Sequence, residues 1–406
     1  MNGSGLWRAE QAWLGDRPGH FVLIEVRQGR ITWIKEDVGG FPEAIELKGW
    51  TIPGLANVHS HAFQRGIRGF VESEGADFWA WREAMYRSTY IDPDRYREQC
   101  RLVFREMLEA GITAVGEFHY LHDQGNAHAR AMVKAAKDVG IRLTLIDACY
   151  LRGGLDGRPL DGQQRTFSDG DVVKWTKRMN DLRNVDGIRI ASAIHSVRAV
   201  DPASMRAVAA YARARRMPLH IHLAEQPAEV EECRAVEDCT PTELLDREGI
   251  LGADLTAVHA IHVDDHDIEL LGKYGVTVCA CPTTERDLGD RVGPLRALAD
   301  AGCGLTVGSD SNAVIDVLEE ARGFELDQRR AMGRRVIHTP EELFRAATVG
   351  GMRALGWETA GLMPGMLADF VTIRSQEALS AAKVIFSASG CDVTNVVVGG
   401  RTLVSK

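Results

Sequence analysis

Four short segments carry residues that could bind a metal ion or move protons. The first, His59-Ser60-His61, ends an apolar run. Side chains two residues apart on a strand point to the same face, so the two imidazoles would converge. Converging imidazoles suit a divalent transition metal, zinc first. Alone, the pair is more typical of an ordinary strand end than of a metal site.

The other three segments add donors of the same kind. His222 and Glu225 end a second apolar run, where they would supply a third imidazole and a carboxylate able to reach a water on the metal. His220 has the same parity but lies one layer deeper, which favours a packed histidine. Asp310 ends a third run, although such an aspartate is often only a helix N-cap. His259 and His262 end the fourth.

The elements that must position these residues alternate along the middle of the chain. Strand-like runs end near residues 61, 120, 150, 196, 225, 262, 283 and 311, and helical patterns such as 95–110 and 203–216 lie between most of them. Eight such units predict a (β/α)8 barrel, with residues 66–92 as a long first loop. Active sites of such barrels form at the carboxyl ends of the strands, where all four segments lie. Their joint occurrence predicts a metal site.

Both ends of the chain are rich in strand patterns instead. Residues 21–34 read as a hairpin, as do residues 395–404 around Gly399-Gly400. We therefore expect one small β domain assembled from residues 1–52 and 364–406, with the barrel, residues 53–363, inserted in it.

The expected chemistry is hydrolysis. Zinc lowers the pKa of a bound water to about 7, and a nearby glutamate can take that proton and deliver it to a leaving group. A phosphate-binding loop of the type G-x-x-x-x-G-K-[ST] does not occur in the sequence, so nucleotide-cofactor chemistry is not expected.

Composition and charge exclude several classes of partner and cellular location. The 406 residues carry a formal net charge of -9, which argues against a nucleic-acid partner or an anionic membrane. The eight cysteines are scattered, as in a reducing cytoplasm. No signal peptide and no apolar run of about 18 residues is recognisable. We expect a cytoplasmic enzyme with a small-molecule substrate.

The motifs together resemble the amidohydrolase superfamily. Residues 51–61 are similar to its opening motif, and residues 365–371 to its return into a β-sandwich built from both termini. The fourth strand-like run ends in His195-Ser196 without the lysine of binuclear members, so the resemblance implies one metal ion. It further implies the metal ligands His59, His61, His222 and Asp310, the proton shuttle Glu225, and His259 as the residue that orients the hydroxide. By analogy it also implies a homodimer.

Five segments narrow the resemblance to the formimidoylglutamate deiminases. They are residues 61–65, 78–82, 117–120, 195–198 and 284–290. This subfamily converts N-formimino-L-glutamate and water to N-formyl-L-glutamate and ammonia. The motif match implies that substrate is bound by Gln64, Arg82, Tyr120, His195 and Arg198. Arginine forks are natural partners for two carboxylates. The chain departs from the pattern at Arg291, where a glycine is usual.

Two alternatives stay open from the sequence. One is an aminohydrolase of the same group acting on a nucleobase, a nucleoside or another formimino amino acid, although neutral bases have little need of two arginines. The other is a non-catalytic scaffold of the same fold, although such relatives typically lack ligands that are intact here.

Overall fold

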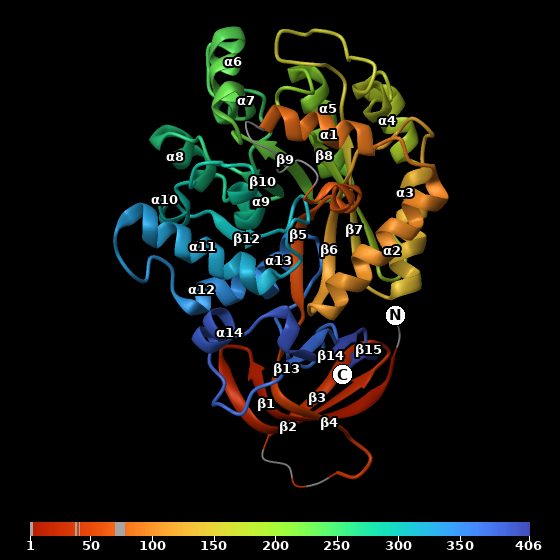
Figure 1. The fold of residues 1–406 in the computed structure, drawn as a ribbon, viewed down its shortest axis with the longest axis vertical. Helices are drawn as coiled ribbons and strands as arrows, with labels where there is room; N and C mark the ends of the chain where they lie inside the picture. Colours follow the sequence, from red (N-terminus) through yellow and green to blue (C-terminus); the bar gives the residue numbers. More distant parts are fainter. Residues whose placement is uncertain (1–2, 37–38, 40, 70–77) are drawn as a thin grey trace.

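The eight strand-like runs form one parallel sheet in the computed structural model (Figure 1). The structure describes residues 3–36, 39, 41–69 and 78–406. The last strand meets the first through a bridge between Ser60 and Asp310, so that the sheet closes into a barrel. In order of pairing the strands are β5 (Leu55–Ser60), β6 (Ile112–His119), β7 (Arg142–Cys149), β8 (Ile188–Ile194), β9 (Leu219–Leu223), β10 (Leu255–His259), β11 (Thr277–Ala280) and β12 (Gly304–Val307).

The strands are shorter at their carboxyl ends than predicted. The first ends at residue 60 rather than 61, and the last at 307 rather than 311. At the ends of β9 and β10 the backbone leaves the extended conformation because Ala224 and His259 adopt positive φ of 48° and 73°. Strands β6 and β7 are buried at every residue, as expected of parallel strands covered on both faces.

The helices that cover the barrel include both predicted ones, α2 (Pro93–Glu109) and α5 (Pro202–Ala214). Asp92 caps α2 by accepting hydrogen bonds from two backbone N–H groups, and Pro93 occupies the first helical position, where no N–H is needed. The other helices of the barrel layer are α3 (Ala127–Val139), α4 (Val172–Met179), α6 (Pro227–Glu237), α7 (Pro241–Arg247), α8 (Asp265–Lys273), α9 (Pro282–Asp287), α10 (Leu295–Ala301), α11 (Val317–Met332), α12 (Pro340–Arg345) and α13 (Gly351–Ala354).

The prediction of one long first loop over residues 66–92 is wrong. The segment contains the end of a 3-10 helix, η1 (Ala62–Ile67), and an α-helix, α1 (Phe78–Ser88). Trp81 and Met85, four residues apart, share one side of α1 and pack against the barrel core. Residues 70–77 and the side chains of Phe78 and Trp79 lie outside the described residues.

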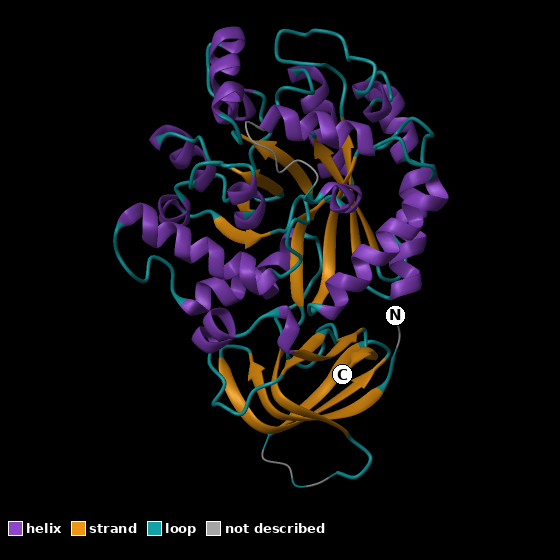
Figure 2. Cartoon of the chain, viewed as in Figure 1, coloured by secondary structure: helices purple, strands orange, loops and turns teal. Residues whose placement is uncertain are grey.

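Both termini contribute to a second sheet beneath the barrel (Figure 2). It curls around its own core, where the rings of Trp7 and Phe370 meet at 5.5 Å. The predicted fold class, a barrel with a small β-sandwich domain from both ends, is confirmed; the domain boundaries stay a prediction. In order of pairing the strands are β15 (Arg401–Ser405), β14 (Val393–Val398), β13 (Phe370–Ile373), β4 (Ile45–Pro53), β1 (Gly5–Leu14), β2 (Arg17–Arg27) and β3 (Arg30–Lys35).

A buried ion pair joins the two sheets. Arg142, the first residue of β7, donates both a side-chain Nε–H and an Nη2–H to the carboxylate of Asp369, next to β13. The side chains of both residues are only 4% exposed. Further cover at the junction comes from α14 (Ala381–Ser387), which contacts α12 of the barrel layer.

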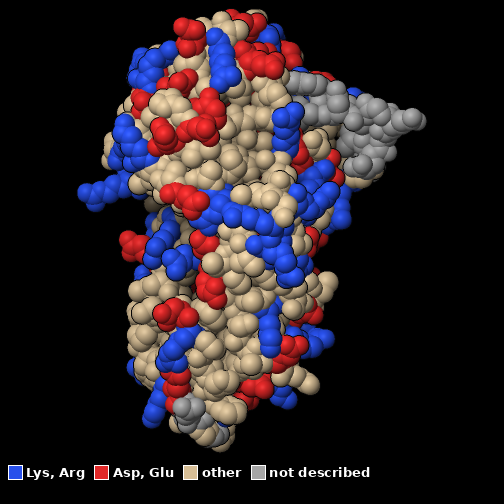
Figure 3. All heavy atoms as spheres, turned by 90° about the vertical axis from the view of Figure 1, so that its left-hand side faces the viewer, with Lys and Arg blue, Asp and Glu red and all other residues tan. Residues whose placement is uncertain are grey.

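Charged side chains of both signs are interspersed on the face in Figure 3, and the basic ones gather in a band across its middle. All eight cysteines are free thiols. Among the described residues, no helix combines the length and the apolar character needed to cross a membrane.

Candidate active site

Four buried side chains meet at the carboxyl ends of three barrel strands. His59 and His61 come from the end of β5, His222 from β9, and Asp310 follows β12. The Nε2 atom of His59 lies 3.1 Å from Nε2 of both His61 and His222. The Oδ1 atom of Asp310 lies 3.4 Å from His59 and 3.3 Å from His61. The structure thus brings together all four predicted metal ligands.

The hydrogen bonds behind these rings set their protonation. Nδ1 of His61 donates to the carbonyl of Phe118 at 3.0 Å, and Nδ1 of His222 donates to that of His195 at 2.9 Å. A carbonyl only accepts, so each Nε2 presents a lone pair to the cluster when the ring is neutral.

Burial and the His59 ring lower the pKa of His61 to about 3, and burial lowers the pKa of His222 as well. Burial opposes ionisation of Asp310, but its hydrogen bond with His59 and the charges of the neighbouring histidines together outweigh that effect and lower its pKa. Three imidazole nitrogens and a carboxylate so close together form a donor set that fits a cation.

The backbone is unusual where the functional side chains emerge. Positive φ occurs at Ala224, beside Glu225, and at His259 and Asp310 themselves. Non-glycine residues adopt this conformation at a cost, and such residues cluster at functional sites. Here the positive φ turns the backbone sharply at each of the three positions. Glu225, His259 and Asp310 are thereby directed into one pocket, which all three line.

Glu225 and His259 lie beside the donor cluster. Nε2 of His259 is 3.8 Å from Oε1 of Glu225 and 3.7 Å from Oδ2 of Asp310. Its Nδ1 lies 3.2 Å from Oε1 of Glu285, which holds the ring in place. Burial lowers the pKa of His259, but the nearby carboxylates, Glu225 first, outweigh burial and raise it to about 10.

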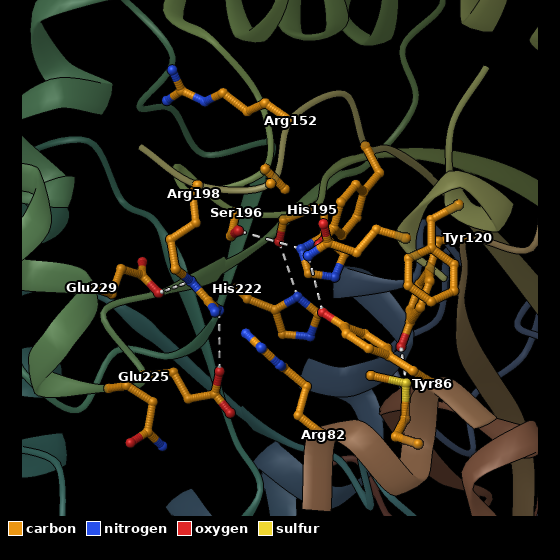
Figure 4. Close-up of a pocket in the computed structure, with 18 of the residues that line it drawn as sticks. Arg82, Tyr86, Tyr120, Arg152, His195, Ser196, Arg198, His222, Glu225 and Glu229 are labelled. Carbon is orange, nitrogen blue, oxygen red and sulfur yellow. Dashed lines mark hydrogen bonds and ion pairs between the residues drawn. The ribbon is translucent and has the colours of Figure 1, made fainter. Parts of the chain in front are cut away.

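The two predicted arginines enter the pocket from opposite sides (Figure 4). Arg82, on α1, places its guanidinium 5.3 Å above the ring of Tyr86. Arg198, after β8, donates through Nε to Oε2 of Glu229 at 3.0 Å and has its Nη2 3.6 Å from Glu225. Arg198 is therefore held next to the carboxylate with the predicted proton-transfer role.

The three other predicted substrate residues also line the pocket. Nε2 of Gln64 donates to the hydroxyl of Tyr120 at 3.2 Å, while its buried Oε1 has no hydrogen-bond partner among the described residues. His195 packs against Tyr150 with ring centres 4.5 Å apart. An amide oxygen without a donor fits a ligand N–H group.

Several lining residues were not predicted. Tyr86 lies on α1, Tyr150 follows β7, Gln164 lies on the 3-10 helix η2 (Gln164–Phe167), and Glu229 lies on α6. No short motif connects these positions, because each reaches the pocket from a different element of the chain. Arg291, the departure from the resemblance, is exposed and does not line the pocket.

A second donor cluster lies elsewhere in the barrel layer and comprises His119, His122 and Asp147. Both oxygens of Asp147 accept hydrogen bonds at 2.7 Å from Arg178, and Trp175 donates a further one at 3.0 Å. The guanidinium of Arg178 thus already supplies the positive charge that Asp147 needs. We therefore interpret this cluster as a structural ion pair rather than a metal site.

Known proteins resemble nearly the whole chain. A sequence profile of the Amidohydrolase family matches residues 50–403. The formimidoylglutamate deiminase of Pseudomonas aeruginosa is 32% identical, over 98% of this chain and 94% of its own. A 5-methylthioadenosine/S-adenosylhomocysteine deaminase of Natronomonas pharaonis is 26% identical, over 94% of this chain and 88% of its own.

Solved structures share the fold as well. An amidohydrolase from Brucella melitensis superposes with a TM-score of 0.90 at 32% identity, covering 99% of this chain and 95% of that one. A zinc-bound adenosine deaminase from Xanthomonas campestris gives a TM-score of 0.85 at 23% identity, covering 99% of this chain and 93% of that one.

Proposed function

The chain belongs to the amidohydrolase family and is a metal-dependent hydrolase of carbon–nitrogen bonds, and from this premise we propose that it hydrolyses N-formimino-L-glutamate to N-formyl-L-glutamate and ammonia. The observation that carries this proposal is the pairing of the metal-donor cluster with two arginines in one pocket. The substrate has two carboxylates and one formimino group, and each has a matching partner there.

The residues that would hold the metal ion are His59, His61, His222 and Asp310. We propose zinc, one ion per chain, because three neutral imidazoles and a carboxylate form a typical zinc donor set. When bound, zinc polarises the substrate and activates water near neutral pH.

Glu225 would move the proton. Its carboxylate takes a proton from the attacking water, whose oxygen bonds to the formimino carbon, and then delivers that proton to the terminal nitrogen. The second proton of the water, left on the carbon-bound oxygen, reaches the same nitrogen through this carboxylate as the carbon–nitrogen bond breaks, so that ammonia and the N-formyl product leave. His259 lies within 4 Å of both Glu225 and Asp310 and would orient the attacking oxygen between them.

The pocket walls would position the substrate. Arg198, held by Glu229 beside Glu225, suits the carboxylate nearest the formimino group. Arg82 would neutralise the second carboxylate, and the unpartnered Oε1 of Gln64 would accept a hydrogen bond from a substrate N–H. Tyr120 and His195 would complete the wall and keep water out.

Ammonia release by the purified, zinc-loaded protein tests the proposal. We expect a kcat/KM above about 10⁴ M⁻¹s⁻¹ for N-formimino-L-glutamate, within the usual enzyme range. N-formimino-L-aspartate, one methylene shorter, should be about 10- to 200-fold worse. Deamination of adenosine derivatives with no turnover of formimino amino acids would overturn the proposed substrate class.

A further inference from the structure

Two tyrosine hydroxyls in the pocket are left without a role by the proposed mechanism. Tyr86 and Tyr150 are 4% and 7% exposed, and they reach the pocket from α1 and from the end of β7. Between them lies the side chain of Gln164, itself 5% exposed. Its Nε2 atom is 3.3 Å from each hydroxyl oxygen.

The orientation of the Gln164 amide is fixed. Its Oε1 accepts a hydrogen bond from the backbone N–H of Asp161 at 3.1 Å, so its NH2 group faces the tyrosines and donates to both. A hydroxyl oxygen that accepts in this way keeps its own hydrogen for a different acceptor. The two hydroxyls also interact with each other, and among the described residues neither has a further hydrogen-bond partner. In that contact one hydroxyl donates to the other, so one hydroxyl hydrogen is left to point at a ligand.

The surroundings of these hydroxyls favour an anion. The guanidinium of Arg82 lies 5.3 Å from the centre of the Tyr86 ring. Burial raises the pKa of Tyr150, so its hydroxyl remains a donor at neutral pH. Hydrogen bonds from neutral donors to a carboxylate are strong in a pocket that excludes water.

We propose that Tyr86 and Tyr150, oriented by Gln164, bind the side-chain carboxylate of the substrate and select for a dicarboxylate. This inference rests on the proposed function. Arg198 contacts Glu225 and so lies beside the reacting group, where the α-carboxylate must be. The tyrosines and Gln164 come from elements that carry neither a metal donor nor Glu225, which places them on the side of the pocket left for the more distant carboxylate.

The test compares two substrates that differ at one group. N-formimino-L-glutamate has the side-chain carboxylate, and N-formimino-L-glutamine replaces it with a neutral amide of the same shape. For Tyr86→Phe and Tyr150→Phe we expect kcat/KM to fall about 10- to 100-fold for the glutamate compound, mostly through KM. The glutamine compound should change no more than a few-fold.

A matched control is Tyr211→Phe. Tyr211 is also 7% exposed, and its hydroxyl donates to the Asn180 side chain at 3.1 Å, but it does not line the pocket. This variant should leave both substrates unaffected. Gln164→Met tests the positioning role: it should lower the preference for glutamate over glutamine, whereas a purely structural residue would lower both activities equally.

The outcomes separate the two proposals. A wild-type protein inactive on N-formimino-L-glutamate overturns the proposed function and this subsite with it. An active wild type, together with Tyr86→Phe and Tyr150→Phe variants that retain the full preference for glutamate, overturns the subsite alone. The hydroxyl hydrogens would then serve only ordered water.

Discussion

At the residue scale, the position of Glu225 is set by neighbours on two other strands. Arg198 lies 3.6 Å from its Oε2 and His259 lies 3.8 Å from its Oε1. Glu229 fixes Arg198, and Glu285 fixes His259, so the Glu225 carboxylate is positioned by two supported cationic groups. A side chain held in this way can transfer a proton without first losing conformational freedom.

Glu225→Gln isolates the proton transfer. The amide has the same shape and leaves the four metal donors untouched, but it cannot take a proton from water. We expect turnover to fall about 10²- to 10⁴-fold while the metal content per chain stays unchanged. Ammonia release and elemental analysis of the same preparation check both parts. Turnover within a few-fold of the wild type would show that another group moves the proton.

The donor residues could be predicted because their signal is local. Two histidines at i and i+2, and further donors at other strand ends, converge in any barrel of this kind. Tyr86, Gln164 and Glu229 could not be predicted, because their contacts join elements more than thirty residues apart in the chain or depend on an amide orientation. The carboxylate of Glu285 lay within a recognised motif, but only the structure pairs it with His259.

At the element scale, the seam between β5 and β12 differs from the rest of the barrel. β6 and β7 pair over six residues, whereas β5 and β12 meet in a single bridge. A buried side-chain network strengthens the seam: Asn57 donates to Ser309 Oγ at 2.6 Å, and Asn312 donates to the His61 carbonyl at 3.0 Å. Three of the four metal donors, His59, His61 and Asp310, lie at this seam.

Metal removal should therefore loosen the barrel at one place. Chelation should lower the free energy of unfolding by about 4 kcal/mol relative to protein held at a free metal concentration 1,000-fold above Kd. Amide hydrogen exchange should accelerate at residues 57–61 and 308–312, while β7 and β8 keep their protection. Exchange measured by mass spectrometry checks this. An even acceleration over all eight strands would contradict a cross-linking role for the ion.

The existence of the barrel strands was predictable from alternating apolar runs and helical patterns, but their ends were not. The apolar runs continue through Ala224 and His259, and the positive φ at these two residues, which ends β9 and β10, has no sequence signal. Helix α1 lies in the segment that was predicted to be a loop, although Trp81 and Met85 have helical spacing.

At the scale of the whole molecule, the barrel and the terminal sheet are coupled by Arg142 and Asp369. The shared β-rich character of the two termini predicted that they assemble together, but no pattern marks these two residues as partners. Their fork-shaped pairing is buried, and Asp369 Oδ1 also accepts the backbone N–H of Gly399 at 2.7 Å. The pair thus connects β7, β13 and the turn that precedes β15.

Breaking this pair should destabilise the whole chain rather than one part. Removing one partner of a buried ion pair leaves an uncompensated charge, so Arg142→Met should lower the free energy of unfolding by about 3–5 kcal/mol. The double variant Arg142→Met, Asp369→Asn should recover part of that loss, because no unpaired charge remains. Urea unfolding followed by circular dichroism checks both values. The exposed pair Arg97–Asp138 supplies the control, since Arg97→Met should cost less than about 1 kcal/mol. If Arg142→Met instead separated unfolding into two transitions, the pair would be what makes the barrel and the sheet unfold as one unit. An unchanged urea midpoint for Arg142→Met would show that the remaining contacts at the junction hold the barrel and the sheet together without this pair.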